Sequence, residues 1–570
     1  MRVIQDLGID SFLMLNCFHS DYFNNAMLKF LIMSFKISPT LQAILLASVL
    51  SICISCSSES KQLYSDGAAT LSNINIIDVR TGDVRFNADI TIAEGKIISI
   101  VDHDAAIKNP SNIIDCSNKF VIPGLWDMHT HIRSYQGEDV LPMFIVHGVV
   151  GIRDLGLTEY QLIKRWQEEI EQGQMIGPTI VSSGVIFEGP EPRFRSSVIL
   201  SRVEQVGPAI DGLIEDNVTI VKLFENLPTD VYEAALKYSM EKGLRTAGHI
   251  PADWSQIRAA EAGLDSIEHL MGIDVLQPGI MSGEVSDAEI EQLASSLVEN
   301  ETYECPTFVG WTHYVKLAFT DTKVEEANTA ITSNPNRLYV PAYFLSWWDR
   351  NLSEAERYNM SSYEPTIGAA ERALHLTNRL HQNGVLILAG TDTPNPWTIT
   401  GESLHDELEL FVRAGLSPAD ALQTATLNAA KYLRQSDDHG LVEEGFVADL
   451  VILDENPLEN IQNLRLIDSV VKSSTVYSRQ DIERIRKEQL ERLADRQITD
   501  FDQHIYMDVR RYGVAEVKKR FASPDAFDGL NVEKRHFDRF AALLRDVNQF
   551  DEAALLEKWG SEILEGKGSQ

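Results

Sequence analysis

The sequence contains few cysteines and few positive charges for its length. Only 5 of its 570 residues are cysteine, and three of these precede residue 57, so disulfide bonds cannot hold the rest of the chain together. The 84 aspartates and glutamates outnumber the 50 lysines and arginines, which gives a formal net charge of −34. This charge argues against a nucleic-acid partner, because phosphate binding requires a basic face. A hydrophobic content of 44% excludes a wholly disordered chain and allows a large core.

The apolar run over residues 41–54 is too short to span a membrane comfortably, since a membrane helix needs ~20 residues. A lysine precedes this run and small residues follow it, which is typical of a secretory signal peptide. The sequence CISC over residues 53–56 resembles a bacterial lipobox, although leucine is usual at its first position. We therefore expect residues 1–56 to be a leader and Cys56 to carry a lipid anchor, its only contact with a membrane. The protein would then face the periplasm from the outer membrane of a bacterial cell envelope; a plain signal peptide or an N-terminal anchor helix is the alternative.

Residues 1–32 fit neither kind of leader, because they place three aspartates ahead of the signal. We interpret them as a start-site artefact, with translation beginning at Met33. Residues 57–68 are polar and are expected to form a tether between the leader and the folded protein.

The middle of the chain repeats one pattern: an amphipathic helix, a glycine, a short apolar strand and a polar residue. Glycine after a helix adopts the left-handed conformation that ends it, and a short apolar run suits a strand buried on both faces. This alternation predicts parallel βαβ units, and eight of them fit a (β/α)8 TIM barrel, an α/β fold. A doubly wound open sheet is the alternative, but no G-x-G-x-x-G follows any expected strand. The eight expected strands lie within residues 120–131, 149–154, 178–184, 218–225, 244–249, 264–269, 303–308 and 385–392.

Two β-rich segments, residues 69–119 and 440–477, flank the expected barrel. Each is too short to bury a sheet face alone, so we expect them to pair into one small composite β-sandwich. The barrel would span residues 120–439, and its long insertion at 310–365 is either an aromatic lid over the mouth or an ordinary packed excursion. Residues 478–570 are charged and predicted to be helical, an extension for packing or for assembly into a homo-oligomer.

Polar side chains end five of the expected strands. Strand one ends in His-Thr-His, and the alternation of a strand puts both imidazoles on the same face. Because the carboxyl ends of barrel strands converge on one mouth, these side chains are expected to point into one space. The six residues are His129, His131, Lys222, His249, His269 and Asp392.

Imidazole and carboxylate groups suit a borderline cation such as Zn²⁺, and the absence of paired cysteines argues against a structural zinc site. A protonated lysine cannot bind a metal ion, so Lys222 would be a ligand only after CO2 converts it to a carbamate. Each residue alone has an ordinary alternative: a satisfied core histidine, a salt-bridge or Schiff-base lysine, or a helix-capping aspartate. The occurrence of all six at corresponding strand ends favours a metal site.

The segments that carry these residues resemble the amidohydrolase superfamily. PGLWDMHTH at residues 123–131 is similar to its PGL-x-D-x-H-x-H signature, and VKLF, AGHIP, SIEHL and AGTD follow in the superfamily's order. The stretch at 440–461 is similar to the superfamily's closing segment. The resemblance covers about residues 70–476 and is strongest to the prolidase-like, imidazolonepropionase-related branch, which bears a lysine on strand four.

This resemblance implies a binuclear centre of two divalent ions, Zn²⁺ in the first instance. The two strand-one histidines and Asp392 would hold one ion, and His249 and His269 the other, with N6-carboxylated Lys222 and a hydroxide bridging them. Two cations lower the pKa of a bridging water and polarise the scissile carbonyl. Asp392 would be the catalytic residue that passes the hydroxide proton to the leaving nitrogen. Arg153 and Asp154 would form an ion pair behind the metals.

The expected activity is hydrolysis of the C–N bond of a small amide, a dipeptide or an N-acyl amino acid. Arg193 and Arg195 are candidates to hold a substrate carboxylate, and His147, Tyr232 and His405 are further candidate substrate contacts. One alternative is a hydrolase of a cyclic amide or lactone, or a deaminase, in the same fold. Another is a non-catalytic envelope lipoprotein, which the presence of all six candidate ligands disfavours.

Overall fold

The computed structural model describes the chain from residue 68 onwards, with gaps. The predicted leader, Arg195 and most of the insertion at 310–365 lie outside the described residues. No helix in the described part is both long and apolar enough to cross a membrane. The described residues are 68–104, 112–133, 137–158, 160–194, 196–272, 286–310, 334–341, 344–345, 348, 363–473, 475–495, 509, 513–520, 534–546 and 549–567.

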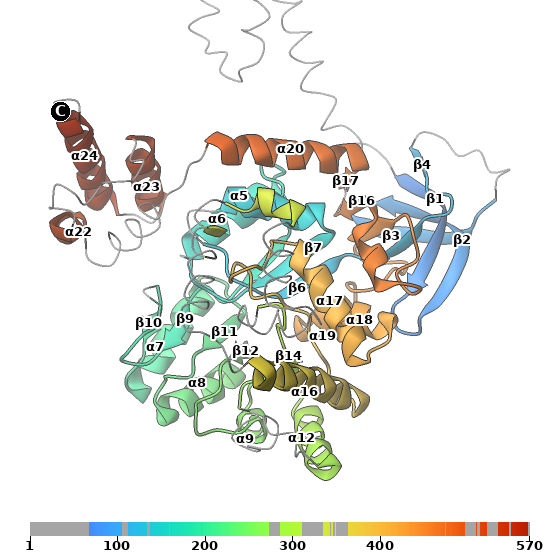
Figure 1. Cartoon of the computed structure of the whole chain (residues 1–570), viewed down its shortest axis with the longest axis horizontal. Coiled ribbons are helices and arrows are strands. Elements are labelled where there is room, and N and C mark those ends of the chain that lie inside the picture. Colours follow the sequence, from blue (N-terminus) through green and yellow to red (C-terminus); the bar gives the residue numbers. More distant parts are fainter. Residues whose placement is uncertain are drawn as a thin grey trace, which may run out of the picture. The chain divides into compact units, whose positions relative to one another are not determined.

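The two predicted β-rich segments form one composite domain, as expected. Strand β15 from the C-terminal segment pairs antiparallel with β5, and β5 pairs with β1, so both segments share an eight-stranded sheet. Figure 1 shows β16 and β17 of the C-terminal segment, in orange, beside the blue strands of the N-terminal segment. The β2–β3 connection is a two-residue hairpin turn, in which Glu94 and Gly95 have φ values of 51° and 74°. The strands are β1 (Ala69–Asp78), β2 (Asp83–Ala93), β3 (Lys96–Asp102), β4 (Ile113–Asp115), β5 (Phe120–Pro123), β15 (Leu450–Leu453), β16 (Ile467–Lys472) and β17 (Thr475–Tyr477).

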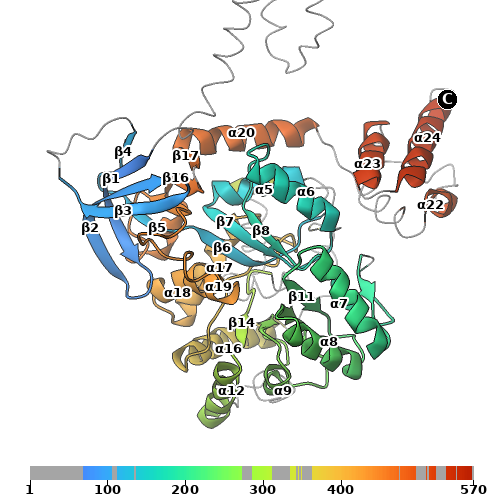
Figure 2. The same cartoon turned by 180° about the vertical axis from the view of Figure 1, so that it is seen from behind.

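The barrel strands are parallel and lie in two sheets. The smaller sheet has the order β6-β7-β8, and the larger has the order β10-β9-β11-β12-β13-β14 (Figure 2). The third predicted strand, residues 178–184, contains β8, which pairs with β7. Strand β9 begins just after the predicted range and pairs with β11. The strands are β6 (Leu125–Thr130), β7 (Val149–Asp154), β8 (Thr179–Ser182), β9 (Ile186–Glu188), β10 (Val198–Ile199), β11 (Ile220–Leu223), β12 (Arg245–Gly248), β13 (Ser266–Glu268) and β14 (Tyr303–Cys305).

The eighth predicted strand, residues 385–392, bridges the two sheets through backbone hydrogen bonds. Leu388 N donates to Glu304 O of β14 at 2.8 Å, and on the other side Met128 N of β6 donates to Ala389 O at 2.8 Å. This segment makes isolated bridges rather than a continuous ladder. Eight positions of an α/β barrel are thus occupied in the predicted order.

The first predicted strand, residues 120–131, is in fact two strands that belong to different domains. Residues before Gly124 form β5 of the sandwich, and residues after it form β6 of the barrel. A Cβ atom at Gly124 would lie 2.3 Å from Val150 Cγ2, so a side chain does not fit where the chain passes from one domain to the other. Apolar residues lie on both sides of Gly124, which is why the sequence predicts one strand.

Helices follow the barrel strands and carry much of the core. Their inner residues, such as Leu162, Trp166 and Leu236, are fully buried with the strand side chains in one large apolar cluster. The helices are α5 (Gly137–Val146), α6 (Tyr160–Glu171), α7 (Val206–Glu215), α8 (Thr229–Glu241), α9 (Gln256–Glu261), α12 (Asp287–Glu299), α16 (Tyr363–Gln382), α17 (Glu402–Ala414), α18 (Pro418–Thr424) and α19 (Leu427–Tyr432).

The C-terminal extension is helical, as predicted. The first of its helices, α20, contacts α5, where Gln489 Nε2 donates to Asp139 O. Helices α23 and α24 pack together, with the rings of Phe537 and Trp559 5.6 Å apart. The described helices of the extension are α20 (Arg479–Asp495), α22 (Val514–Arg520), α23 (Lys534–Asp546) and α24 (Phe550–Lys567).

Candidate metal centre

All six predicted ligands lie at or next to the carboxyl ends of barrel strands. His129 is the second-to-last residue of β6, and His131 follows that strand directly. His249 and His269 are the first residues after β12 and β13. Lys222 lies on β11, paired with Ala247 of β12, and Asp392 ends the bridging segment. Parallel packing of these strands brings together residues that are up to 263 positions apart in the sequence.

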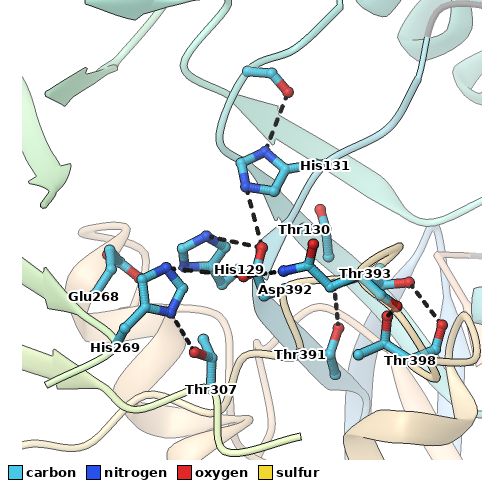
Figure 3. A network of polar contacts seen from close by, with 12 residues as sticks. His129, Thr130, His131, Glu268, His269, Thr307, Thr391, Asp392, Thr393 and Thr398 are labelled. Atoms are coloured by element: carbon cyan, nitrogen blue, oxygen red, sulfur yellow. Dashed lines mark hydrogen bonds and ion pairs between the residues drawn. The ribbon is translucent and has the colours of Figure 1, made fainter. Parts of the chain in front are cut away.

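Three imidazoles surround the Asp392 carboxylate (Figure 3). The Nε2 atoms of His131 and His129 lie 3.3 and 3.6 Å from Asp392 Oδ1, and His269 Nε2 lies 3.9 Å from Oδ2. One ligand atom from each of His129, His269 and Asp392 lies within 4.8 Å of the others, a spacing at which they could hold one ion. The ring of His249 lies 5.0 Å from that of His269, so a second pair of imidazoles adjoins the first group.

Each of the four imidazoles has its Nδ1 atom engaged by a neighbouring oxygen. This arrangement leaves Nε2 available as the ligand atom, and second-shell contacts of this kind commonly orient metal-binding histidines. The Nδ1 contacts are His129 to Glu268 Oε2 at 2.6 Å, His131 to Gly156 O at 3.4 Å, His249 to Glu225 Oε2 at 2.5 Å, and His269 to Thr307 Oγ1 at 2.5 Å.

Two of the candidate ligands have a strained backbone. His269 and Asp392 have φ values of 63° and 56°, in the left-handed region that residues with side chains rarely occupy. Such conformations cost ~1–3 kcal/mol each and persist where the surrounding structure imposes them. Here they belong to residues whose side chains approach each other, although β14 lies between the strand that His269 follows and the segment that ends in Asp392.

The local electrostatics keep these groups in the protonation states that a cation requires. Burial lowers the pKa of His129 and His249 well below the ordinary value, and nearby Lys222 lowers both further. Burial is also the main reason that the pKa of His269 is lowered to about 3. Burial acts to raise the pKa of Asp392, but the surrounding histidines outweigh it and lower that pKa. These shifts favour neutral rings at His129, His249 and His269 and an ionised carboxylate at Asp392, which are the metal-binding forms.

Two buried nitrogen atoms at this site have no hydrogen-bond partner among the described residues. These are His129 Nε2 and Lys222 Nζ, on side chains that are 0% and 1% exposed. An unpaired buried polar atom is costly, so it indicates that a partner is needed there. The donor set, the free Nε2 atom and the convergent geometry together fit a divalent metal ion.

The amidohydrolase family matches residues 120–477, which is more than half of the chain. The chain belongs to the amidohydrolase family. This confirms the resemblance seen in the sequence motifs and agrees with the barrel and composite sandwich.

Two further comparisons find a similar curated protein and solved structures of the same fold. The adenine deaminase of Desulforamulus reducens is 20% identical over 389 residues, which cover 68% of this chain and 54% of that protein's length. The solved structure of a bottromycin amidohydrolase has a TM-score of 0.58 and 21% identity, over 75% of this chain and 90% of that one. An Xaa-Pro dipeptidase solved with methionine in its active site has a TM-score of 0.55 and 19% identity, over 72% of this chain and all of that one.

The prediction that Arg153 and Asp154 of this amidohydrolase form an ion pair is wrong. Neighbouring residues of a strand point to opposite faces, so Arg153 and Asp154 each contact other residues. Arg153 points into the barrel and donates to both oxygens of Glu268, at 2.8 and 3.0 Å. Asp154 accepts from Ser182 Oγ at 2.7 Å and from Ile132 N at 2.9 Å.

The sequence motifs do not reveal the residues that support the candidate ligands. Asp127 is fully buried and accepts hydrogen bonds from Thr391 N and Oγ1, at 3.0 and 2.6 Å, so it ties β6 to the segment that ends in Asp392. Burial raises the pKa of Asp127 to about 7. Glu268 directly precedes His269 and Glu225 lies three residues after Lys222, but nothing in the sequence pattern indicates which imidazole each one contacts.

The candidate substrate contacts fall in different environments. Tyr232 is fully buried in α8 and donates to His249 O at 2.8 Å, so it supports the backbone of a ligand instead of facing the mouth. His147 precedes β7, at the end of that strand opposite the cluster, and its carbonyl accepts from His405 Nε2 at 2.8 Å. Both histidines are buried, and we assign all three residues a structural role, correcting the prediction. Arg193 is exposed on the loop after β9.

Proposed function

We propose that this amidohydrolase hydrolyses a C–N bond of a small amide, most specifically a dipeptide or an N-acyl amino acid. The observation that carries the proposal is the convergence of four imidazoles, an ionised carboxylate and an unpaired buried lysine at one barrel mouth. Two bound divalent ions, Zn²⁺ in the first instance, would supply a water of lowered pKa and polarise the scissile carbonyl. His129, His131 and Asp392 would hold one ion, and His249 and His269 the other.

Lys222 is the candidate bridging ligand. Its Nζ atom is buried without a hydrogen-bond partner among the described residues, and burial lowers its pKa. A lysine that loses its proton easily can attack CO2, forming an N–C bond and releasing one proton, so that a carboxylate replaces the amine. The resulting carbamate would present two oxygen atoms to the centre.

Asp392 is the candidate catalytic residue. Asn395 Nδ2 donates to its Oδ2 at 2.5 Å, which fixes the carboxylate plane beside the histidines. From this position Asp392 can accept a proton from the attacking water and return it to the leaving nitrogen. Because its pKa is lowered, Asp392 is ionised at neutral pH, which is the form that can accept this proton.

An apolar wall capped by a cation supports a carboxylate-bearing substrate. The Phe224 ring lies 4.3 Å from that of His249, and Phe194 packs on Phe224 at 5.5 Å. The Arg193 guanidinium lies 5.7 Å from the Phe194 ring. A dipeptide or N-acyl amino acid has a free carboxylate that Arg193 could bind and an apolar group that could rest on Phe194.

The test is a substrate panel with the purified, metal-loaded protein. Dipeptides, N-acyl amino acids, cyclic amides and adenine would be supplied in parallel, with release of amine and of ammonia measured separately. Release of an amino acid from a dipeptide or N-acyl amino acid supports the proposal. Release of ammonia from adenine, with no cleavage of the linear amides, would favour a deaminase instead.

We also propose that the mature protein is anchored to the outer membrane through a lipid on Cys56 and faces the periplasm. The lipobox-like CISC sequence supports this location. The helical extension that begins with α20 remains a candidate for homo-oligomer assembly.

A further inference from the structure

A fully buried carboxylate lies directly behind one of the candidate ligands. Glu268 is the last residue of β13, and its Oε2 atom is 2.6 Å from His129 Nδ1. The opposite ring atom, His129 Nε2, is the one that lies 3.6 Å from Asp392. The His129 ring is therefore held between an inner carboxylate and the candidate metal position.

Glu268 is itself held by a built network. Arg153 donates to both of its oxygens, and Ser266 Oγ donates to Oε1 at 2.6 Å. The guanidinium of Arg153 lies 4.7 Å from the Tyr432 ring and donates through Nε to Met128 O. These contacts leave the carboxylate little freedom to move, so the hydrogen bond to His129 has a fixed direction.

The Glu268 contact differs from the other Nδ1 contacts. Both side chains of the His129–Glu268 pair are 0% exposed, whereas those of the His249–Glu225 pair are 13% and 30% exposed. The partners of His131 and His269 are a carbonyl and a hydroxyl, which carry no charge. Among the four imidazoles, only His129 contacts a fully buried carboxylate that is also paired with a buried arginine.

We propose that Glu268, backed by Arg153, is a positioning residue that sets the affinity of the ion held by His129. An ionised acceptor at Nδ1 keeps the proton on that nitrogen, which leaves the Nε2 lone pair for the metal and makes the ring a stronger ligand. The inference rests on the proposed metal centre and adds to it the group that prepares one ligand.

A second ion pair in the same barrel provides a matched control. Arg245 NH1 lies 2.6 Å from Asp265 Oδ1, and the Arg245 guanidinium lies 5.4 Å from the same Tyr432 ring. None of the contacts described for this pair involves an imidazole. Its side chains are 12% and 20% exposed, so neutralising it removes a barrel ion pair that is slightly less buried, with no direct effect on His129.

The experiment measures zinc affinity and stoichiometry by competition with a chromophoric chelator in the full chain. The variants are Glu268→Gln, the double variant Arg153→Met/Glu268→Gln, and the control Arg245→Met/Asp265→Asn, each checked for folding by circular dichroism. The double variant is essential, because Glu268→Gln alone leaves a buried arginine unpaired and can unfold the chain. Removing both charges avoids that penalty.

We expect the double variant to bind one ion about 10- to 100-fold more weakly than the wild type and the second ion unchanged. The control variant should bind both ions with wild-type affinity. A folded double variant with wild-type affinity for both ions would overturn the positioning role while leaving the proposed function intact. A wild-type protein that binds no zinc would overturn the proposed centre and this inference with it.

Discussion

Replacing Lys222 with methionine should separate stability from activity in this protein. The substitution keeps an unbranched side chain of similar volume at a position that is 1% exposed, and it removes the unpaired Nζ atom. An unsatisfied buried polar group costs ~1–3 kcal/mol, so the metal-free variant should unfold with a free energy higher by about that amount. Activity should fall at least ~100-fold, because the proposed centre would lose its bridging ligand.

The stability gain should depend on pH in a defined direction. Burial lowers the pKa of Lys222 in the folded protein, so the unfolded chain binds this proton more tightly. The wild type therefore loses stability as the pH falls below the ordinary lysine pKa of ~10.4 toward the lowered value. The advantage of Lys222→Met over the wild type should be larger at pH 7 than at pH 10.

Chemical denaturation of metal-free protein at both pH values measures the stability, and turnover of the best panel substrate measures the activity. Lys222→Ala provides a second check, since the space it leaves should admit a short carboxylic acid and restore part of the activity. Full activity in Lys222→Met would refute the carbamate bridge. If the free energy of unfolding of metal-free Lys222→Met were several kcal/mol lower than that of the wild type, Lys222 would have a stabilising partner in the folded protein.

Four further predictions concern single residues. Burial raises the pKa of Glu304 well above its ordinary value, so Glu304→Gln should raise the melting temperature at pH 8, with the difference vanishing near pH 4, whereas exposed Glu301→Gln should change little. Asp392→Asn should lower kcat by about 10²- to 10⁴-fold, and a variant with wild-type kcat would exclude it as the proton carrier. Arg193→Ala should lower kcat/KM about 10- to 100-fold for substrates with a free carboxylate and leave esters of the same substrates unaffected. Cys56→Ser should abolish incorporation of radiolabelled palmitate during growth; continued labelling would contradict the lipid anchor.

The barrel was predictable from the sequence because its signals are local. Four of the βα units repeat a helix, a glycine and a short apolar run. The strands β7, β11, β12, β13 and β14 lie where the apolar runs predict them. The helix that starts at Pro418 has Ser417 as its cap, and Ser417 Oγ accepts from Asp420 N at 3.1 Å. The polar residues that end the strands were equally visible, since each interrupts an apolar run.

What the sequence could not predict depends on contacts between distant residues. The division between β5 and β6 lies at Gly124, which packs closely against Val150. The run of apolar residues around Gly124 does not reveal this contact. Arg153 pairs with Glu268, 115 residues away, because both side chains point into the barrel. Tyr232 was expected to touch substrate, but its position on the inner face of α8 buries it completely.

The central claim is that this amidohydrolase holds two metal ions at the mouth of its barrel. Metal content per chain, measured by plasma mass spectrometry on protein purified without chelators, tests this claim most directly. We predict about two divalent ions per chain. A single ion would point to the cyclic-amide or deaminase branch with Lys222 in a structural role, and no metal after addition of Zn²⁺ and bicarbonate would contradict the account.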